Sequence, residues 1–103
     1  MPTNDYTLLI PYFDDYDNLI MLLKDIHDGN LRDHPQQILI IDDGSYDDRI
    51  RFIHSQYSST NLPPIMVRRM THQGPYYAET YGLSLIKTPY TIVCHSDTRL
   101  LGN

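Results

Sequence analysis

The hydrophobic residues of the chain gather in four short runs, which are separated by longer and more polar stretches. The runs are YTLLIP (6–11), QQILIID (36–42), PIMVRR (64–69) and YTIVCH (90–95), and each is rich in Ile, Val or Leu. Short apolar runs of this composition are typical of β-strands. The continuous apolar segment ILII within the second run favours a strand that is buried on both faces, as in parallel sheets.

The stretch after the first run has the spacing of an amphipathic helix. Four apolar residues recur at i, i+3, i+4 and i+7, namely Leu19, Leu22, Leu23 and Ile26. This spacing places them on one face of a helix. Asp15 or Asp17 is suited to cap the start of the helix, and Gly29 is suited to end it.

Two further helices are predicted after the second and third runs. The first of these starts near Ser45 or Asp47 and is short, with one apolar face made of Ile50, Ile53 and Tyr57. The other begins at Pro75, a residue that suits a first helical turn. Its predicted face combines small and large residues, namely Ala78, Tyr81, Gly82 and Leu85.

Strand and helix patterns thus alternate along the whole chain, which favours an α/β fold with parallel strands joined by right-handed crossovers. A chain of 103 residues has room for one small domain but not for two. We therefore expect a single domain that spans residues 1–103.

Composition narrows the classes of function. A formal charge of −5 and a pI near 5.3 argue against nucleic acid as a partner, because binding to a phosphate backbone needs clustered Lys and Arg. The only cysteine, Cys94, excludes an intrachain disulfide and is expected to be a small buried hydrophobe rather than a nucleophile. No secretory signal pattern and no membrane-spanning apolar run is present, so we expect a cytoplasmic chain.

The segments that immediately follow the predicted strands are the place to look for a ligand site. In open α/β sheets, ligands bind outside the carboxyl ends of the strands. The segments concerned are 11–14, 42–45, 69–74 and 95–98, and several of their residues are carboxylates. Neighbouring carboxylates repel one another unless a cation or hydrogen-bond donors compensate them, and a hard divalent cation prefers such oxygen ligands.

The order of the motifs resembles a known family. LLIPYFDDYDNL, ILIIDDGSYDD, THQGPYYAETYGLSL and YTIVCHSD follow one another as in the N-terminal, nucleotide-sugar-binding half of family 2 glycosyltransferases. The resemblance runs from about Tyr6 to Thr98. It implies a GT-A type, Rossmann-like and mostly parallel sheet of about four strands in the order 3-2-1-4, flanked by helices and truncated relative to the full fold.

The resemblance also implies a nucleotide site. Asp43 matches the group that accepts a hydrogen bond from the N3–H of a uracil-type base, while Pro11 and Phe13 match the lining of the base pocket. Either member of the pair Asp42 and Asp43 could instead cap the following helix, and Asp43 is favoured as the ligand-binding one. The nucleotide-binding residues predicted in this way are Pro11, Phe13, Asp14, Asp43, Gly74 and His95.

A divalent metal is implied as well. Asp97 matches the last Asp of the family's Asp-x-Asp element, which binds Mn²⁺ or Mg²⁺ on the donor's diphosphate. The first Asp of that element is His95 here, and Glu79 stands where the family usually has Arg. Of the five dispersed histidines, only His95, followed by His72, lies at the predicted ligand edge.

The predicted function is therefore the binding of a nucleotide-diphosphate sugar, of the UDP type, with a divalent metal for sugar transfer to an unknown acceptor. The resemblance places the catalytic base downstream of Asn103, so the isolated chain is expected not to complete the transfer. The alternative is a non-catalytic binding or assembly module that keeps the fold. A phospho-acceptor receiver domain is disfavoured, because MVRRMTHQG supplies neither the Asp nor the Lys that such a domain needs.

The fourth run carries one more expectation. In the order 3-2-1-4, YTIVCH at 90–95 lies at a sheet edge with unpaired backbone groups, which favours self-association. We expect a homo-oligomer through this edge or through another apolar face.

Overall fold

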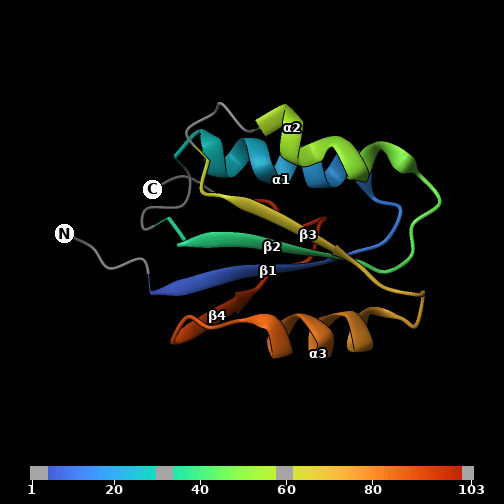
Figure 1. The fold of residues 1–103 in the computed structure, drawn as a ribbon. Helices are drawn as coiled ribbons and strands as arrows, with labels where there is room; N and C mark the ends of the chain where they lie inside the picture. Colours follow the sequence, from blue (N-terminus) through green and yellow to red (C-terminus); the bar gives the residue numbers. More distant parts are fainter. Residues whose placement is uncertain (1–4, 30–33, 58–61, 101–103) are drawn as a thin grey trace.

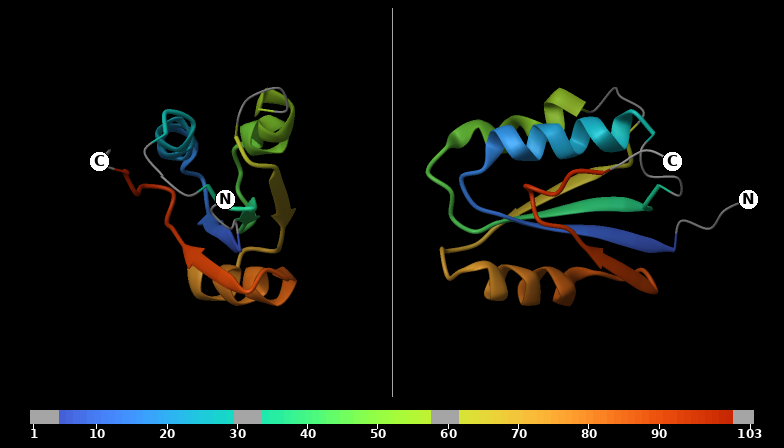
Figure 2. Two further views of the ribbon diagram at one scale, coloured as in Figure 1. Left: turned by 90° about the vertical axis from the view of Figure 1, so that its left-hand side faces the viewer. Right: turned by 180° about the vertical axis from the view of Figure 1, so that it is seen from behind.

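The computed structural model describes residues 5–29, 34–57 and 62–100, which form three layers (Figure 1). A parallel sheet lies between α1 and α2 on one face and α3 on the other (Figure 2). The strands are β1 (Tyr6–Tyr12), β2 (Gln37–Asp42), β3 (Ile65–Arg69) and β4 (Tyr90–Val93). The helices are α1 (Tyr16–His27), the 3₁₀ helix η1 (Asp48–Phe52), α2 (Ile53–Tyr57) and α3 (Pro75–Leu85).

The sheet has the strand order β3-β2-β1-β4, and all three pairings are parallel. Leu8 on β1 lies opposite Ile38 on β2 and Ile92 on β4. The predicted α/β class and the order 3-2-1-4 are therefore confirmed. The prediction for the last strand was too long, because β4 ends at Val93 and a turn follows at Ser96.

Most of the core lies between the sheet and the layer of α1 and α2. The predicted helical face of α1 is confirmed, since Leu19, Leu22, Leu23 and Ile26 are all fully buried. They pack with strand residues of the same face, among them Leu8, Ile10, Ile38 and Ile40. The segment ILII at 38–41 is buried throughout, as expected for a central strand that is covered on both faces.

The ends of the helices follow the sequence signals in part. Asp15 occupies the N-cap position of α1, but its side chain makes no capping hydrogen bond. Gly29, just after the C-cap, has a φ of 85° and so ends the helix as predicted. The second helical stretch begins at Asp48, and Asp47 is its N-cap, as one of the two predicted starts, with a side chain that accepts a hydrogen bond from the N–H of Arg49.

The face predicted for α3 is only half correct. Ala78 and Gly82 are buried, whereas Tyr81 and Leu85 are 38% and 36% exposed. A Cβ on Gly82 would clash with Leu9 Cδ1 and lie 3.0 Å from Ile41 Cγ1. The helix thus approaches the sheet through its two smallest residues and leaves its large ones outside. No helix in the described part of the chain is long and apolar enough to cross a membrane.

Candidate functional site

Hydrogen bonds join the four segments at the carboxyl ends of the strands. The loop after β1 bonds to the loop after β2 through Asp14 and Ser45, at 2.9 Å between the Asp14 N–H and Ser45 Oγ. The same β1 loop bonds to the segment after β4 through Ser96 Oγ and Asp15 Oδ2, at 2.7 Å. These contacts bring the segments predicted from the sequence together at one edge of the sheet.

Asp42 shapes the turn after β2 and does not face a ligand site. Its side chain is 2% exposed; Oδ1 accepts the Ser45 N–H at 3.0 Å, and Oδ2 accepts a hydrogen bond from Arg69 Nη1, also at 3.0 Å. Arg69 Nη2 also donates to the Ser45 carbonyl at 3.1 Å. The alternative that Asp42 or Asp43 caps the following helix is therefore wrong, because the N-cap of η1 is Asp47 and Asp42 stabilises the turn before it.

Asp43 holds the loop between β3 and α3 in place. Its Oδ1 and Oδ2 accept the N–H groups of Gln73 and Gly74, at 2.8 Å and 2.9 Å. The Nδ1 atom of His72 lies 3.0 Å both from Asp43 Oδ2 and from the Asp43 carbonyl oxygen. Since both partners are acceptors, Nδ1 carries a proton in this geometry. Gly74 is thus bound by Asp43 through its N–H, at the N-cap of α3.

Gly44 allows the two loops to come so close. Its φ is 72°, a left-handed conformation that favours glycine. A Cβ at this position would lie 2.8 Å from the backbone nitrogen of His72. The glycine of the DDGS motif is therefore required both by the turn and by the approach of the neighbouring loop.

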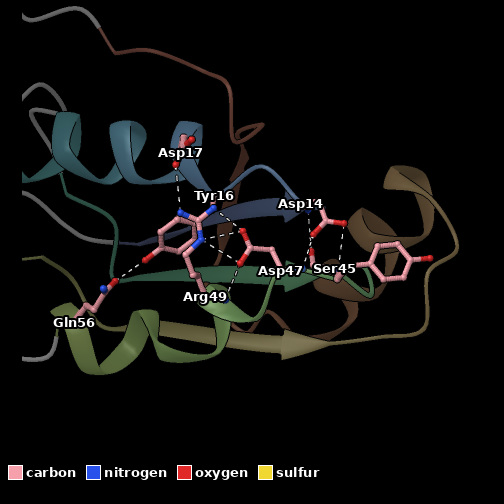
Figure 3. Close-up of polar contacts among 8 residues, drawn as sticks. Asp14, Tyr16, Asp17, Ser45, Asp47, Arg49 and Gln56 are labelled. Atoms are coloured by element: carbon pink, nitrogen blue, oxygen red, sulfur yellow. Dashed lines mark hydrogen bonds and ion pairs between the residues drawn. The ribbon is translucent and has the colours of Figure 1, made fainter.

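Asp14 fixes the position of the loop after β2 (Figure 3). Its Oδ2 accepts the N–H of Tyr46 at 3.2 Å, and its Oδ1 accepts the N–H of Asp47 at 2.9 Å. The residue has a φ of 44°, which is unusual for a residue other than glycine. The carboxylate predicted to bind nucleotide thus contacts the protein backbone in this structure.

A second polar cluster, made of Tyr16, Asp47, Arg49 and Gln56, contacts the loop after β2 (Figure 3). Arg49 binds Asp47 through Nη2 at 2.6 Å, and its guanidinium lies 4.4 Å from the centre of the Tyr16 ring. The Tyr16 hydroxyl donates to Gln56 Oε1 at 2.6 Å. Residues of α1, η1 and α2 are joined in this way, and the hydrogen bond to Arg49 lowers the pKa of Asp47.

A small pocket of about 150 Å³ opens beside Asp43. Its lining residues are Pro11, Tyr12, Phe13, Asp43, His72, Pro75, Ala78 and His95. The Phe13 and His72 rings are stacked, with centroids 4.3 Å apart and an interplanar angle of 28°. Four of the six predicted nucleotide-binding residues thus line one pocket, while Asp14 and Gly74 are not among its lining residues.

Tyr12 lines this pocket although most of the residue is in the core, where it is only 2% exposed. Among residues 5–29, 34–57 and 62–100, its hydroxyl has no hydrogen-bond partner. Burial raises the pKa of the Tyr12 phenol well above its usual value. The backbone of Asp15 near the Tyr12 hydroxyl lowers this pKa in part, although the two groups do not form a hydrogen bond.

Asp97 differs from the other carboxylates at this edge. The negative charges of Asp14, Asp42 and Asp43 are compensated by backbone N–H groups, Arg69 or His72. Asp97 is exposed in the turn after β4, and its carboxylate has no hydrogen-bond or ion-pair partner within the described residues.

At this edge of the sheet, Asp97 would be the single carboxylate that binds a metal ion. No group of three or more His, Cys, Asp or Glu side chains in the described ranges could hold a metal ion. Mg²⁺ is often bound by one or two carboxylates together with substrate phosphates. Asp97 suits that role, whereas a metal site built from protein ligands alone does not fit these residues.

Several residues of the pocket are less prominent in the sequence than in the structure. The sequence favours His95 over His72, yet the His72 ring stacks on Phe13 and its Nδ1 bonds to Asp43. Pro75 and Ala78 are predicted for the helix start and the packing face, and both also line the pocket. The signal was available, because the first turn of a helix after a parallel strand lies at the ligand edge.

Comparisons with solved structures identify the fold. The crystal structure of S. aureus TarS has a TM-score of 0.70 and 16% identity, over 89% of this chain and 16% of that one. The structure of S. aureus TarS 1–349 has a TM-score of 0.74 and 18% identity, over 91% of this chain and 28% of that one. The structure of TarS 1–349 in complex with UDP has a TM-score of 0.72 and 18% identity, over 89% of this chain and 27% of that one.

At 16–18% identity, these similarities show a shared fold, and each covers only part of the TarS structure. The chain spans between 16% and 28% of the lengths of the three TarS structures. A search of curated protein sequences gives no significant match. The model of the family described as Glycosyl transferase family 2 matches residues 7–102, which is nearly the whole chain. The chain therefore belongs to glycosyl transferase family 2, and its sheet is that of the GT-A type.

Proposed function

We propose that this chain binds the nucleotide part of a UDP-type sugar donor in the pocket between Phe13, Asp43 and His72. The observation that carries the proposal is the combination of a buried carboxylate with an exposed aromatic ring at the carboxyl edge of the sheet. The family assignment and the likeness in fold to a TarS structure in complex with UDP support it.

The chemistry of Asp43 suits an imide N–H. An ionised carboxylate has about four lone-pair positions, and three donors already approach this one, from His72, Gln73 and Gly74. One position is left for the N3–H of a uracil-type base. Phe13, which is 38% exposed, offers a ring face on which a base can stack.

His95 and Asp97, which follow β4, would bind the other parts of the donor. His95 lines the same pocket and can hydrogen-bond a ribose hydroxyl through its imidazole. Asp97 would hold Mn²⁺ or Mg²⁺ jointly with the diphosphate of the donor. A metal bound there would neutralise charge on the departing nucleoside diphosphate. We expect a hexosyl group to be transferred to an acceptor whose nature stays open.

No residue of the described chain is assigned as the base that deprotonates the acceptor. The carboxylates of Asp14, Asp42 and Asp43 are bound to backbone N–H groups or to Arg69, and that of Asp15 accepts hydrogen bonds from Asn18 and Ser96, so they do not suit that role. We therefore expect the 103-residue chain to bind a donor without completing the transfer. The cytoplasmic location stays a prediction, which cell fractionation would test.

Titration calorimetry with UDP, with and without Mn²⁺, tests the proposal. We expect binding that Mn²⁺ strengthens, and a loss of that metal dependence in Asp97→Ala. Phe13→Ala should lose about 1–3 kcal/mol of binding free energy, the usual contribution of base stacking. Asp48→Ala is the matched control, because Asp48 is an exposed carboxylate of η1 outside the pocket.

The second candidate function is a binding or assembly module without chemistry. It is favoured by two departures from the family pattern, His95 in place of Asp and Glu79 in place of Arg. Its signature in the same experiment is a folded chain that binds neither UDP nor UDP with Mn²⁺. That outcome would refute the donor-binding proposal.

A further inference from the structure

The imidazole ring of His72 makes the two contacts that the proposed function assigns to a base. It stacks on the Phe13 ring, with centroids 4.3 Å apart and an interplanar angle of 28°. Its Nδ1–H donates to Asp43 Oδ2, at 3.0 Å between the two heavy atoms. A uracil-type base would likewise place a flat ring on Phe13 and donate an in-plane N–H to Asp43.

The pocket beside Asp43 opens on the side of Phe13 that this imidazole covers. His72 lines the pocket together with Phe13 and Asp43, so its ring lies inside the site rather than behind it. The volume of the pocket is about 150 Å³, whereas pockets that bind small molecules usually measure about 300–1,000 Å³. The space is therefore too small for a nucleoside as long as the imidazole stays in place.

His72 also lies between this pocket and a neighbouring hollow of about 450 Å³. The residues that line the hollow are Gly44, Arg69, Met70, Thr71 and His72. Within the described part of the chain, His72 is the one residue that the two lining sets have in common. A rotation of this single side chain would therefore enlarge the pocket toward the hollow.

The His72 side chain can leave the pocket without disturbing the loop that carries it. The side chain is 56% exposed, and exposed side chains change rotamer within nanoseconds. Asp43 still accepts the N–H groups of Gln73 and Gly74 at 2.8 Å and 2.9 Å, and these bonds keep the loop in place. Departure of the imidazole thus uncovers one face of Phe13 and frees a position on Asp43 Oδ2.

We propose that His72 occupies the base site of the free chain, and that a base binds by displacing the imidazole from Phe13 and Asp43. This inference rests on the proposed function of the pocket. The observed affinity for a nucleotide is then lowered by the fraction of chains in which the imidazole has not left. His72 therefore determines how tightly the nucleotide binds, although it contacts neither Phe13 nor Asp43 in the bound complex.

Titration calorimetry of the 103-residue chain with UDP and Mn²⁺ tests the proposal. His72→Ala removes the competing ring, so UDP should bind about five- to tenfold more tightly, since no aromatic stack has to be broken first. His54→Ala replaces an exposed histidine outside the pocket and is the matched control, with unchanged affinity. His72→Phe also loses the bond to Asp43 but keeps a ring on Phe13, and it should gain much less affinity than His72→Ala. An equal gain in both variants would attribute the effect to the loop and overturn the proposal.

NMR spectra of the unmodified chain provide a measurement that does not depend on how well the variants fold. In the free chain, the Phe13 ring should shift the ring protons of His72 upfield, and saturation with UDP should return them to the values of an exposed histidine. Upfield shifts that persist with UDP bound, or no gain of affinity in His72→Ala, would overturn the displacement while the donor site stands. If neither the unmodified chain nor His72→Ala binds UDP, the proposed function is refuted and the displacement with it.

Discussion

Arg99 binds the buried carboxylate of Asp25 through two of its nitrogens. Nε lies 2.9 Å from Oδ2, and Nη2 lies 2.8 Å from Oδ1. The N–H of Leu100 also donates to Oδ2 at 2.9 Å. The segment after β4 is therefore fastened to α1, which determines the direction in which the chain leaves the turn that contains Asp97.

This contact predicts a pH dependence of stability. The hydrogen bonds from Arg99 are the main cause that lowers the pKa of Asp25 to about 2, from an ordinary 3.8. The carboxylate thus stabilises the fold fully above its ordinary pKa. That contribution is lost as the pH falls from about 4 to about 2, because the unfolded chain binds the proton first.

Urea unfolding across this pH range is the measurement. Asp25→Asn should lower stability at neutral pH and reduce the loss of stability toward acid. Asp28→Asn, on the same helix, is the matched control, because Asp28 pairs with the exposed Lys24, and exposed pairs contribute little. An acid dependence in Asp25→Asn as steep as in the unmodified chain would contradict the prediction.

Asp14 is expected to affect the stability of the fold in two separable ways. Its side chain stabilises the loop by accepting hydrogen bonds from two backbone N–H groups, whereas its φ of 44° is a conformation that is costly for most residues. Asp14→Gly loses the hydrogen bonds but adopts this φ freely, whereas Asp14→Ala loses the bonds and adds strain. We expect the Ala variant to be less stable than the Gly variant by about 1 kcal/mol.

Denaturant unfolding of the two variants measures this difference. Asp17→Ala is the control, since Asp17 is a highly exposed side chain that meets Arg49 only at 3.6 Å, and we expect its stability to stay close to that of the unmodified chain. Equal stability of Asp14→Gly and Asp14→Ala would show that the backbone conformation relaxes when the carboxylate is removed.

The contacts of Asp14 and Arg99 mark the limit of what the sequence could predict. Periodicity predicted the strands and helices, because apolar burial repeats with each element's own period, whereas the strand order followed from the resemblance to the family. The contacts that arrange the loops depend on pairs far apart in the chain, such as Asp25 with Arg99. No local pattern distinguishes Asp25 from an exposed helical carboxylate.

The same limit applies to the pocket. The motif order led to Pro11, Phe13, Asp43 and His95, all of which line it. It gave no way to tell that Asp14, next to Phe13, contacts the loop after β2. Neighbouring residues in a loop point in different directions, and only the fold decides which of them reaches a ligand.

Cys94 is expected to react slowly with alkylating reagents. Burial raises the pKa of its thiol, and the negative charge of Asp97 raises it further, while a hydrogen bond with Thr98 acts in the opposite direction. Because the thiolate is the reactive form, a raised pKa lowers the rate. The iodoacetamide rate at mildly alkaline pH should be lower in the native chain than in urea.

The chain has one cysteine, so the ratio of the two rates reports on this site alone. Asp97→Asn should increase the native rate, since it removes a negative charge that opposes the thiolate. Asp48→Asn changes the same net charge at a distant position of η1 and serves as control. Native alkylation as fast as in urea would show that the thiol is not protected.

Gly82→Ala is expected to destabilise the fold although it replaces glycine in a helix. Alanine favours the helix by about 1 kcal/mol, but its Cβ would clash with Leu9 Cδ1 and press on Ile41. Both side chains are fully buried, so they cannot move into solvent. Overpacking of this kind costs about 1–3 kcal/mol, and we expect a net loss of stability.

Thermal and urea unfolding of three variants separate packing from helix propensity. Ser84→Ala, on the exposed side of the same helix, should be neutral or slightly stabilising. Leu9→Val removes the Cδ atoms that the new methyl would meet. The double variant Gly82→Ala/Leu9→Val should therefore be more stable than the sum of its single changes predicts. Strict additivity would instead mean that α3 shifts away from the sheet, so that no contact between position 82 and Leu9 is left to relieve.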